Sequence, residues 1–497
     1  MNNMFKTIFN PLNWKFWIFI SISISFLHLS ISLFHHDLPY DKPFLKTGDS
    51  FDYIASSNSY IINKEFVFFK TTEWEDRTSL IDQKEFDKSL YYAYRSPGYA
   101  FILIPLLKVF YYNTALKYIV ILQVVFYGIA VYLLSLITLN LFNKRKVFYI
   151  IFLLLSISLG SSYWNVFIYT ESFAISFLIF SVFTLFIGLQ RKSYFLFFLS
   201  GLFITESILL RPFLAPILLV HTYLIIREYG FKKSILTLII YLIPFTLIDG
   251  GWTIRNFVKT KELIPLAATT KYHRYRNKAF LKQADTYITI GIPFSFNAWF
   301  FNNDTLKSPV NIYPEKLFTI KNTPNEMLNA KKFYIRSLDR TISRGERAMF
   351  ESRSLKIQTA FLEDFKDENK FTFLTSRLNT LGVLLNQGPI DLLQIDSKLN
   401  DTLNYSQKIL NNFIYYFGLI ATIIALYRFR KNLKILGLIF IPLFLLSFFS
   451  LINLAETREM FIPSFFMLIF AVELMSSLFE KKKWIYIMGI ITFIILF

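Results

Sequence analysis

The sequence contains no cysteine among its 497 residues. This absence excludes disulfide bonds, thiolate metal sites and cysteine nucleophiles. Histidine is also scarce: the five histidines show no metal-ligand spacing, and no glycine-rich phosphate loop is present. The motifs of the common soluble cofactors are therefore missing.

Charged residues are few as well. They make up 18% of the chain, against 54% hydrophobic residues that include 58 Phe. This composition excludes a cytosolic globular protein, because the apolar runs require lipid around them. The 53 Lys and Arg exceed the 34 Asp and Glu, giving a net charge of +19. In a membrane protein this excess indicates cytoplasmic loops held against anionic lipid rather than nucleic-acid binding.

Eleven segments are long and apolar enough to be predicted as membrane-spanning helices, several with flanking aromatic or cationic residues at the interface. They are 14–34, 115–141, 147–162, 168–189, 194–210, 213–227, 234–250, 409–427, 435–451, 461–478 and 484–497. The first is too long for a cleaved signal peptide, so we expect it to remain as an anchor. The predicted fold class is an all-α polytopic membrane protein.

The orientation follows from the cations, which occur at every second connection and are expected inside. They are Lys6, Lys15, Lys144 to Lys146, Arg191, Lys192, Lys232, Lys233, Arg428 to Lys434, and Lys481 to Lys483. The N-terminus is then inside and the C-terminus outside. This topology requires the apolar stretch 96–112 to lie as a helix on the outer surface instead of crossing.

The chain divides into three predicted parts. Residues 1–250 form an N-terminal transmembrane catalytic module that includes a first external loop, 35–114, with juxtamembrane helices. Residues 251–408 form a mainly helical extracytoplasmic segment, and 409–497 form the C-terminal transmembrane helices. Because both long loops fall outside, we expect the function there.

The long external segment carries helix signals of its own. Thr323-Pro324-Asn325-Glu326 predicts a capping box with proline at the first helical position, opening a polar helical stretch through about Lys366. Phe371–Leu385 predicts an amphipathic helix that returns to the membrane.

Acidic residues near the outer interface are the first candidates for chemistry. Asp49 and Asp52 lie in the first external loop, where a hydrated loop is the simple alternative. Glu171 begins an apolar span beside Thr170, the expected helix cap, and could complement the helix dipole. Glu206 lies inside the fifth span, where pairing with Arg211 is its simplest explanation.

Arginines at the outer ends of spans are the second set, since the positive-inside bias does not place them there. They are Arg95, Arg211, Arg255 and Arg458. Guanidinium groups bind phosphate through paired donors, so together they suit a phosphate at headgroup height. For any one of them, snorkelling to lipid headgroups or pairing with a nearby acid such as Glu456 is the alternative.

In order and spacing these motifs resemble the GT-C membrane glycosyltransferases that use polyprenyl-phosphate sugars, especially the bacterial branch related to protein O-mannosyltransferases and lipid A aminoarabinose transferase. The matching pieces are Asp49 with Tyr53, RSPGY at 95–99, YTES at 169–172, LLRP at 209–212, the WTIRN turn at 252–256 and REMFIP at 458–463. The sequence departs from the pattern at Ser50, where many members carry a second acid, so Asp52 is a candidate to share that role.

The resemblance implies an inverting transfer of a sugar from a lipid phosphate to an acceptor on the extracytoplasmic side of a bacterial inner membrane. It implies Asp49 as the general base, with Glu171 either helping to hold a cation or orienting the acceptor, and Tyr53 and the four arginines binding substrate. A divalent cation at Asp49 and Glu171 is an alternative to the arginines for neutralising the leaving phosphate.

Two other functions compete with this interpretation. Eleven spans with buried ionisable residues also fit a flippase for lipid-linked saccharides, although such transporters usually show two related halves and short loops. An O-antigen polymerase or ligase also uses lipid-linked saccharides outside and relies on arginines, but the acidic first-loop motif argues against it.

Overall fold

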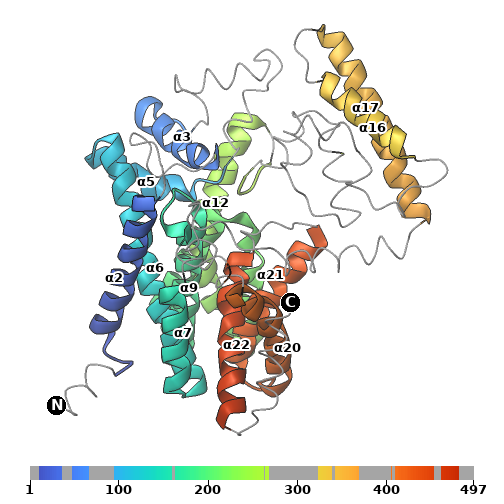
Figure 1. The fold of residues 1–497 in the computed structure, drawn as a ribbon. Coiled ribbons are helices and arrows are strands. Elements are labelled where there is room, and N and C mark those ends of the chain that lie inside the picture. The colour runs from blue at the N-terminus through green and yellow to red at the C-terminus, as the bar shows by residue number, and fades with distance from the viewer. Residues whose placement is uncertain are drawn as a thin grey trace. The chain divides into compact units, whose positions relative to one another are not determined.

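The computed structural model describes residues 10–35, 48–66, 95–158, 163–261, 263–267, 282, 323–337, 342–368, 405, 409–452 and 460–480. Within these ranges every regular element is a helix, which confirms the all-α prediction (Figure 1). The chain divides into two compact units. The first unit contains residues 1–268, 388–445 and 460–497, and the second contains 269–387 and 446–459.

The first unit holds nearly all the apolar helices, which in chain order have these bounds. They are α2 (Trp14–His35), α3 (Gly48–Asn63), α5 (Gly98–Val109), α6 (Tyr112–Phe142), α7 (Arg145–Ile157), the 3₁₀ turn η2 (Tyr163–Asn165), α9 (Thr170–Arg191), α10 (Tyr194–Leu210), the 3₁₀ turn η3 (Pro212–Leu214), α11 (Ile217–Tyr229), α12 (Phe231–Thr260), the π-helical turn η8 (Phe413–Phe417), α20 (Gly418–Arg428) and α22 (Phe461–Glu480). Helix α21 (Leu433–Ile452) begins in this unit.

Five helices of the described chain are long and apolar enough to cross a membrane. They are Tyr112–Phe142, Thr170–Arg191, Phe231–Thr260, Ile409–Arg428 and Phe461–Glu480. Three further predicted spans fall on shorter apolar helices, Trp14–Ser30, Tyr194–Leu210 and Leu433–Phe449. The predicted spans 147–162 and 213–227 coincide with α7 and α11, which have only 13 residues each. The predicted span 484–497 lies outside the described residues.

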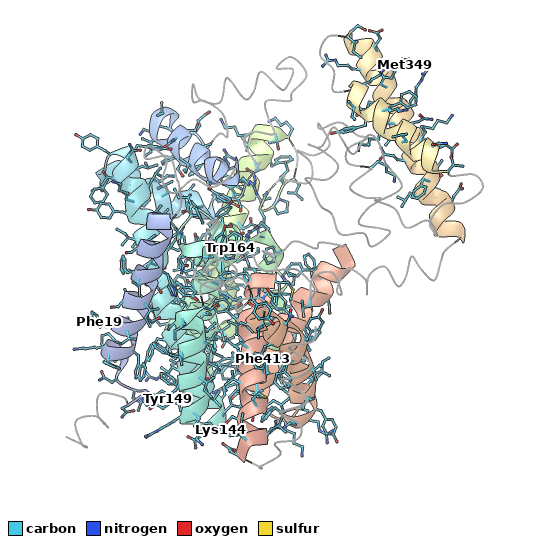
Figure 2. The ribbon with its side chains drawn as sticks, viewed as in Figure 1. Phe19, Lys144, Tyr149, Trp164, Met349 and Phe413 are labelled. Carbon is cyan, nitrogen blue, oxygen red and sulfur yellow. The ribbon has the colours of Figure 1, made fainter. Side chains whose placement is uncertain are left out.

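Helix α5 occupies the apolar stretch that was expected to lie on the membrane surface. Its 12 residues rise about 18 Å, which is shorter than the hydrocarbon core of about 30 Å. Exposed apolar side chains elsewhere fit a lipid environment: Phe19 of α2 is 67% exposed and points away from the other helices (Figure 2).

Close packing at small residues brings α9, α10 and α12 together. The Ser181 hydroxyl of α9 donates to the Ser200 carbonyl of α10 at 2.8 Å. A Cβ on Gly201 would lie 1.9 Å from the carbonyl oxygen of Tyr241, so only glycine allows α10 to approach the α12 backbone this closely. These contacts hold the middle of α10 against α9 and α12.

Helix α12 is longer than predicted, and the expected turn at 252–256 is wrong. The helix runs without interruption through Gly250 and Gly251 to Thr260. Side-chain bonds to the segment that follows offset the low helix propensity of the two glycines. The Trp252 Nε1 donates to the Leu266 carbonyl at 2.8 Å, and the Asn256 Nδ2 donates to the Ile264 carbonyl at 2.9 Å.

In the second unit, α16 (Pro324–Ser337) and α17 (Arg344–Glu368) pack together as a pair. One half of the predicted capping box is present, since the Thr323 backbone N–H donates to the Glu326 Oε2 at 3.1 Å, and Pro324 begins the helix as predicted. The helical stretch expected through Lys366 is not one continuous helix, because α16 ends at Ser337 and α17 begins at Arg344. A second capping box, Ser343 with Glu346, starts a new helix. The predicted helix Phe371–Leu385 lies outside the described residues.

Candidate functional site

A buried ion pair joins two helix ends in the first unit. Glu171 lies in the first turn of α9, and its Oε1 pairs with the Nη2 of Arg211, the residue that ends α10. The two residues are 1% and 8% exposed. Each helix dipole favours the charge at its own end, negative at an N-terminus and positive at a C-terminus. Pro212 disfavours helical backbone angles at Arg211, which adopts φ −138° and ψ 93°.

This pair corrects two expectations about the same region. Arg211 was expected to pair with Glu206, whose buried Oε1 instead makes no hydrogen bond to any described residue. Five positions along a helix do not place two side chains on one face as three or four do. Thr170 was expected to cap α9, but Tyr169 occupies the N-cap position and makes no side-chain bond there.

Three predicted motifs meet around Tyr53. The Thr170 hydroxyl lies 3.3 Å from the Glu171 Oε2 and 3.5 Å from the Tyr53 hydroxyl. The Arg95 guanidinium carbon lies 5.3 Å from the centroid of the Tyr53 ring, within cation–π range. The structure thus brings the first-loop motif, RSPGY and YTES into contact, although they are far apart in the sequence.

The RSPGY motif also touches the end of α10. The Ser96 hydroxyl donates to the Leu209 carbonyl, which supplies an otherwise unpaired acceptor in the last turn of the helix. A Cβ on Gly98 would lie 2.7 Å from the Leu209 carbonyl carbon. Glycine is therefore required at position 98, because any side chain would collide with the α10 backbone.

A buried amide fixes the segment that precedes YTES. The Tyr99 hydroxyl donates to the Gln123 Oε1 at 2.7 Å, and the Gln123 Nε2 donates to the carbonyls of Asn165 at 3.1 Å and Phe167 at 2.7 Å. Asn165 in turn accepts from the Ser172 hydroxyl at 2.5 Å. This network fixes the entry into α9 and hence the position of Glu171.

Gln123 was not predicted as a functional residue, although its position within a long apolar segment could have indicated one. It is a buried polar residue in the 31-residue apolar helix α6. An amide buried in such a helix must satisfy both its donor and its acceptor. The same reasoning applies to Glu473 of α22, a buried acid in a predicted span that was not singled out.

Arg255 makes different contacts from those of Arg211. Its Nη2 donates to the Phe66 carbonyl, and its Nη1 donates to the Asn256 Oδ1 at 2.8 Å. The guanidinium also lies 4.4 Å from the centroid of the Trp252 ring. These bonds connect α12 to the residues that follow α3.

The remaining predicted residues are only partly described. Asp49 and Asp52 lie in the first two turns of α3, four residues and one residue before Tyr53, and their side chains are outside the described set. Arg458 lies outside the described residues, so its predicted convergence with Arg211 and Arg255 remains a prediction.

The surroundings of Glu171 do not favour a metal ion there. The guanidinium of Arg211 already neutralises this carboxylate and would repel a divalent cation at the same place. Among the described side chains, no group of three or more His, Asp or Glu residues could hold a metal.

No protein-family model matches the sequence, and no curated protein matches it. Among solved structures, the chain is similar to the archaeal oligosaccharyltransferase AglB from Archaeoglobus fulgidus, whose structure is in complex with an inhibitory peptide and a dolichol-phosphate. The alignment has 11% identity and a TM-score of 0.48, and covers 97% of this chain. The chain spans about half, 54%, of that protein. A likeness at this level assigns no activity.

Proposed function

We propose that this chain is a membrane glycosyltransferase of the GT-C type, which moves a sugar from a polyprenyl phosphate to an extracytoplasmic acceptor. The observation that supports this proposal most is the grouping of Tyr53, Arg95, Glu171 and Arg211. These residues come from four sequence motifs. The residue types in these motifs, and the order of the motifs along the chain, suggested a lipid-phosphate donor. The group lies beside the start of α3, which carries Asp49.

The proposed reaction is an inverting displacement at the anomeric carbon. The bond between this carbon and the phosphate oxygen breaks, and the polyprenyl phosphate leaves with the electron pair. The acceptor hydroxyl oxygen forms the new bond, and its proton passes to the Asp49 carboxylate, with Asp52 as a second candidate. The leaving phosphate needs neutralisation rather than protonation, so arginines can replace the acid that a glycoside hydrolase uses.

Glu171 acts in this proposal as a positioning residue for Arg211. A carboxylate that pairs with a guanidinium fixes the plane of that planar group. The remaining N–H donors of the guanidinium then point in one defined orientation. This role differs from the two that were expected for Glu171, which were to help hold a cation and to orient the acceptor. Arg95, Arg255 and Arg458 complete the proposed set of phosphate-binding groups, and Tyr53 supports Arg95 through its ring.

The membrane setting is also part of the proposal. Eleven spans, an inside N-terminus and an outside C-terminus would place residues 1–250 as the catalytic module of a bacterial inner-membrane enzyme. Its active site would then face the periplasm, and residues 251–408 would form an extracytoplasmic segment. The acceptor would be a hydroxyl of a lipid, a glycan or a protein.

The test uses purified full-length protein in liposomes with polyprenyl-phosphate sugars that carry a labelled sugar. The proposal predicts loss of labelled donor and release of free polyprenyl phosphate, dependent on an acceptor extract. Glu65→Gln is the matched control, because Glu65 is an exposed acid in the same predicted loop that pairs with Lys259. It should leave the rate unchanged, while Asp49→Asn should abolish it.

Movement of intact donor across the bilayer without bond cleavage would identify a transporter and refute the proposal. Formation of a polymer of donor saccharides, with no dependence on Asp49, would instead identify a polymerase or ligase.

A further inference from the structure

An apolar groove lies in the first unit at the helix ends opposite Glu171 and Arg211. It has a volume of about 450 Å³, within the range of roughly 300–1,000 Å³ that is usual for ligand pockets. Its walls come from α7, the π-helical turn η8 and α22. The apolar lining includes Ile150, Leu154, Phe413, Val472 and Met475.

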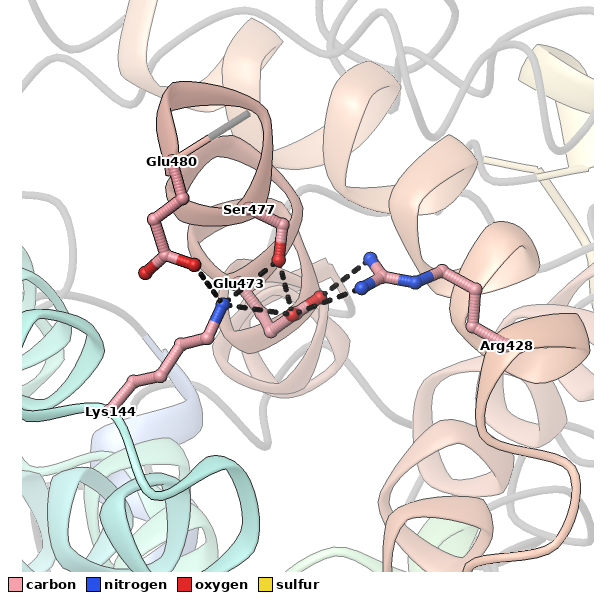
Figure 3. A network of polar contacts seen from close by, with 5 residues as sticks. All are labelled: Lys144, Arg428, Glu473, Ser477 and Glu480. Carbon is pink, nitrogen blue, oxygen red and sulfur yellow. Dashed lines mark hydrogen bonds and ion pairs between the residues drawn. The ribbon is translucent and has the colours of Figure 1, made fainter. Parts of the chain in front are cut away.

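The charges beside the groove form a neutral network (Figure 3). The Lys144 Nζ lies 3.1 Å from the Glu480 Oε2 and 3.8 Å from the Glu473 Oε1. The Arg428 Nη1 lies 3.1 Å from the Glu473 Oε2. The Ser477 hydroxyl donates to the Glu473 Oε1 at 2.8 Å and accepts from Lys144 at 3.0 Å. Two cations therefore balance two carboxylates.

Lys146 is a nearby cation that does not belong to this network. It lines the groove, is exposed, and makes no hydrogen bond or ion pair with the described residues. Among the described lining residues, Lys146 is therefore the one uncompensated positive charge, since Glu480, which also lines the groove, is already paired with Lys144.

Ser476 is a second lining residue without a partner. It is 7% exposed, and its hydroxyl is buried without a hydrogen bond within the described structure. A helical serine usually donates to a carbonyl of the preceding turn, so an unused hydroxyl on a residue that lines the groove could serve a bound carbonyl acceptor. The groove thus offers an apolar channel, one hydroxyl donor and one cation.

We infer that this groove binds one acyl chain of an anionic phospholipid, with the phosphate at Lys146 and an ester carbonyl at Ser476. A phospholipid with one net negative charge, such as phosphatidylglycerol, matches Lys146, the unbalanced cation among the described residues that line the groove. A peptide segment fits poorly, because its backbone N–H groups would find no acceptors along an apolar wall. The site is distinct from the proposed sugar-transfer site and does not depend on it.

Native mass spectrometry of the full-length protein tests the inference by titration with phosphatidylglycerol and phosphatidylethanolamine of the same chain length. Wild type should bind phosphatidylglycerol more tightly. Lys146→Gln should weaken that binding roughly fivefold and remove the preference. Arg145→Gln is the matched control, because Arg145 is exposed but does not line the groove, and it should change little.

The groove itself is tested by Leu154→Trp, which should block acyl-chain binding. Its control is Leu153→Trp, at a neighbouring position that is 53% exposed and outside the groove. If Leu154→Trp does not fold, Ser476→Ala provides the second variant and should weaken binding of the ester lipid but not of an ether-linked analogue. Inorganic phosphate should not compete with the lipid.

Equal binding of the two lipids to wild type would overturn the inference. So would equal losses in Lys146→Gln and Arg145→Gln, since the cation would then act only through the general surface potential. Competition by inorganic phosphate alone would reduce the site to a simple anion site and would also overturn it.

Discussion

Arg211 at the end of α10 forms a buried ion pair with Glu171 in the first turn of α9. Two chain segments that meet the same membrane side in the predicted topology are thereby joined by opposite charges. A buried pair of this kind contributes little net stability when complete, yet removal of one partner leaves an isolated charge in a poorly solvated place.

Glu171→Gln should therefore destabilise the protein by about 3–5 kcal/mol. The double variant Glu171→Gln/Arg211→Gln should be less destabilised than the two single changes predict together, since no charge remains unpaired. Chemical denaturation in detergent measures both. Single variants within about 0.5 kcal/mol of wild type would show that the pair is solvated and unimportant for the fold.

The proposed base gives a second prediction. Asp49→Asn should reduce sugar transfer by about 10²–10⁴-fold at unchanged donor binding, because the amide keeps the shape but cannot accept the proton. Asp52→Asn should reduce the rate less. Transfer assays with labelled donor measure both rates. If the Asp52 variant is inactive and the Asp49 variant is nearly normal, the base is Asp52.

The close approach of α5 to α10 gives a third prediction. Gly98→Ala should destabilise the protein by about 1–3 kcal/mol, because its Cβ would collide with the Leu209 backbone. Gly250→Ala is the matched control, since a Cβ there meets open space inside α12 and alanine favours the helix. Thermal unfolding of the two variants should move in opposite directions. A neutral Gly98→Ala would mean that the two helices can separate at no cost.

The all-α architecture could be predicted from the sequence because apolar run length and helix signals are local properties. The same holds for the Thr323 capping box, whose partners are three residues apart. The Glu171–Arg211 pair could not be predicted in this way. Both charges were visible as candidates, but partner choice depends on which helix ends are adjacent, and the neighbour in sequence, Glu206, was the wrong partner.

Two further misses have the same physical origin. The WTIRN segment at 252–256 was expected to be a turn, whereas it continues α12, where hydrogen bonds from Trp252 and Asn256 to the following segment support the helix. The Lys144–Glu473–Arg428 network was missed because its members lie in separate connections and a predicted span. Only the packing of the helices brings them together.

The second capping box gives a prediction with a defined pH dependence. Hydrogen bonds from the Ser343 hydroxyl and backbone N–H lower the pKa of Glu346 below its ordinary value. A lowered carboxyl pKa contributes stability above the unfolded pKa, and that contribution is lost as the pH falls through the folded pKa. Glu346→Gln should therefore speed amide exchange in residues 344–350 near neutral pH. In acid well below the ordinary glutamate pKa of about 4.3, wild type and variant should exchange alike.

Hydrogen exchange followed by mass spectrometry measures this effect, with α16 as the internal reference. Glu363→Gln is the control, because Glu363 is an exposed acid farther along α17 and should not affect the first turn. Ser343→Ala should act like Glu346→Gln near neutral pH, because it removes the other half of the box and costs about 1 kcal/mol. An exchange difference that persists unchanged into acid would show that the carboxylate charge does not stabilise the start of α17.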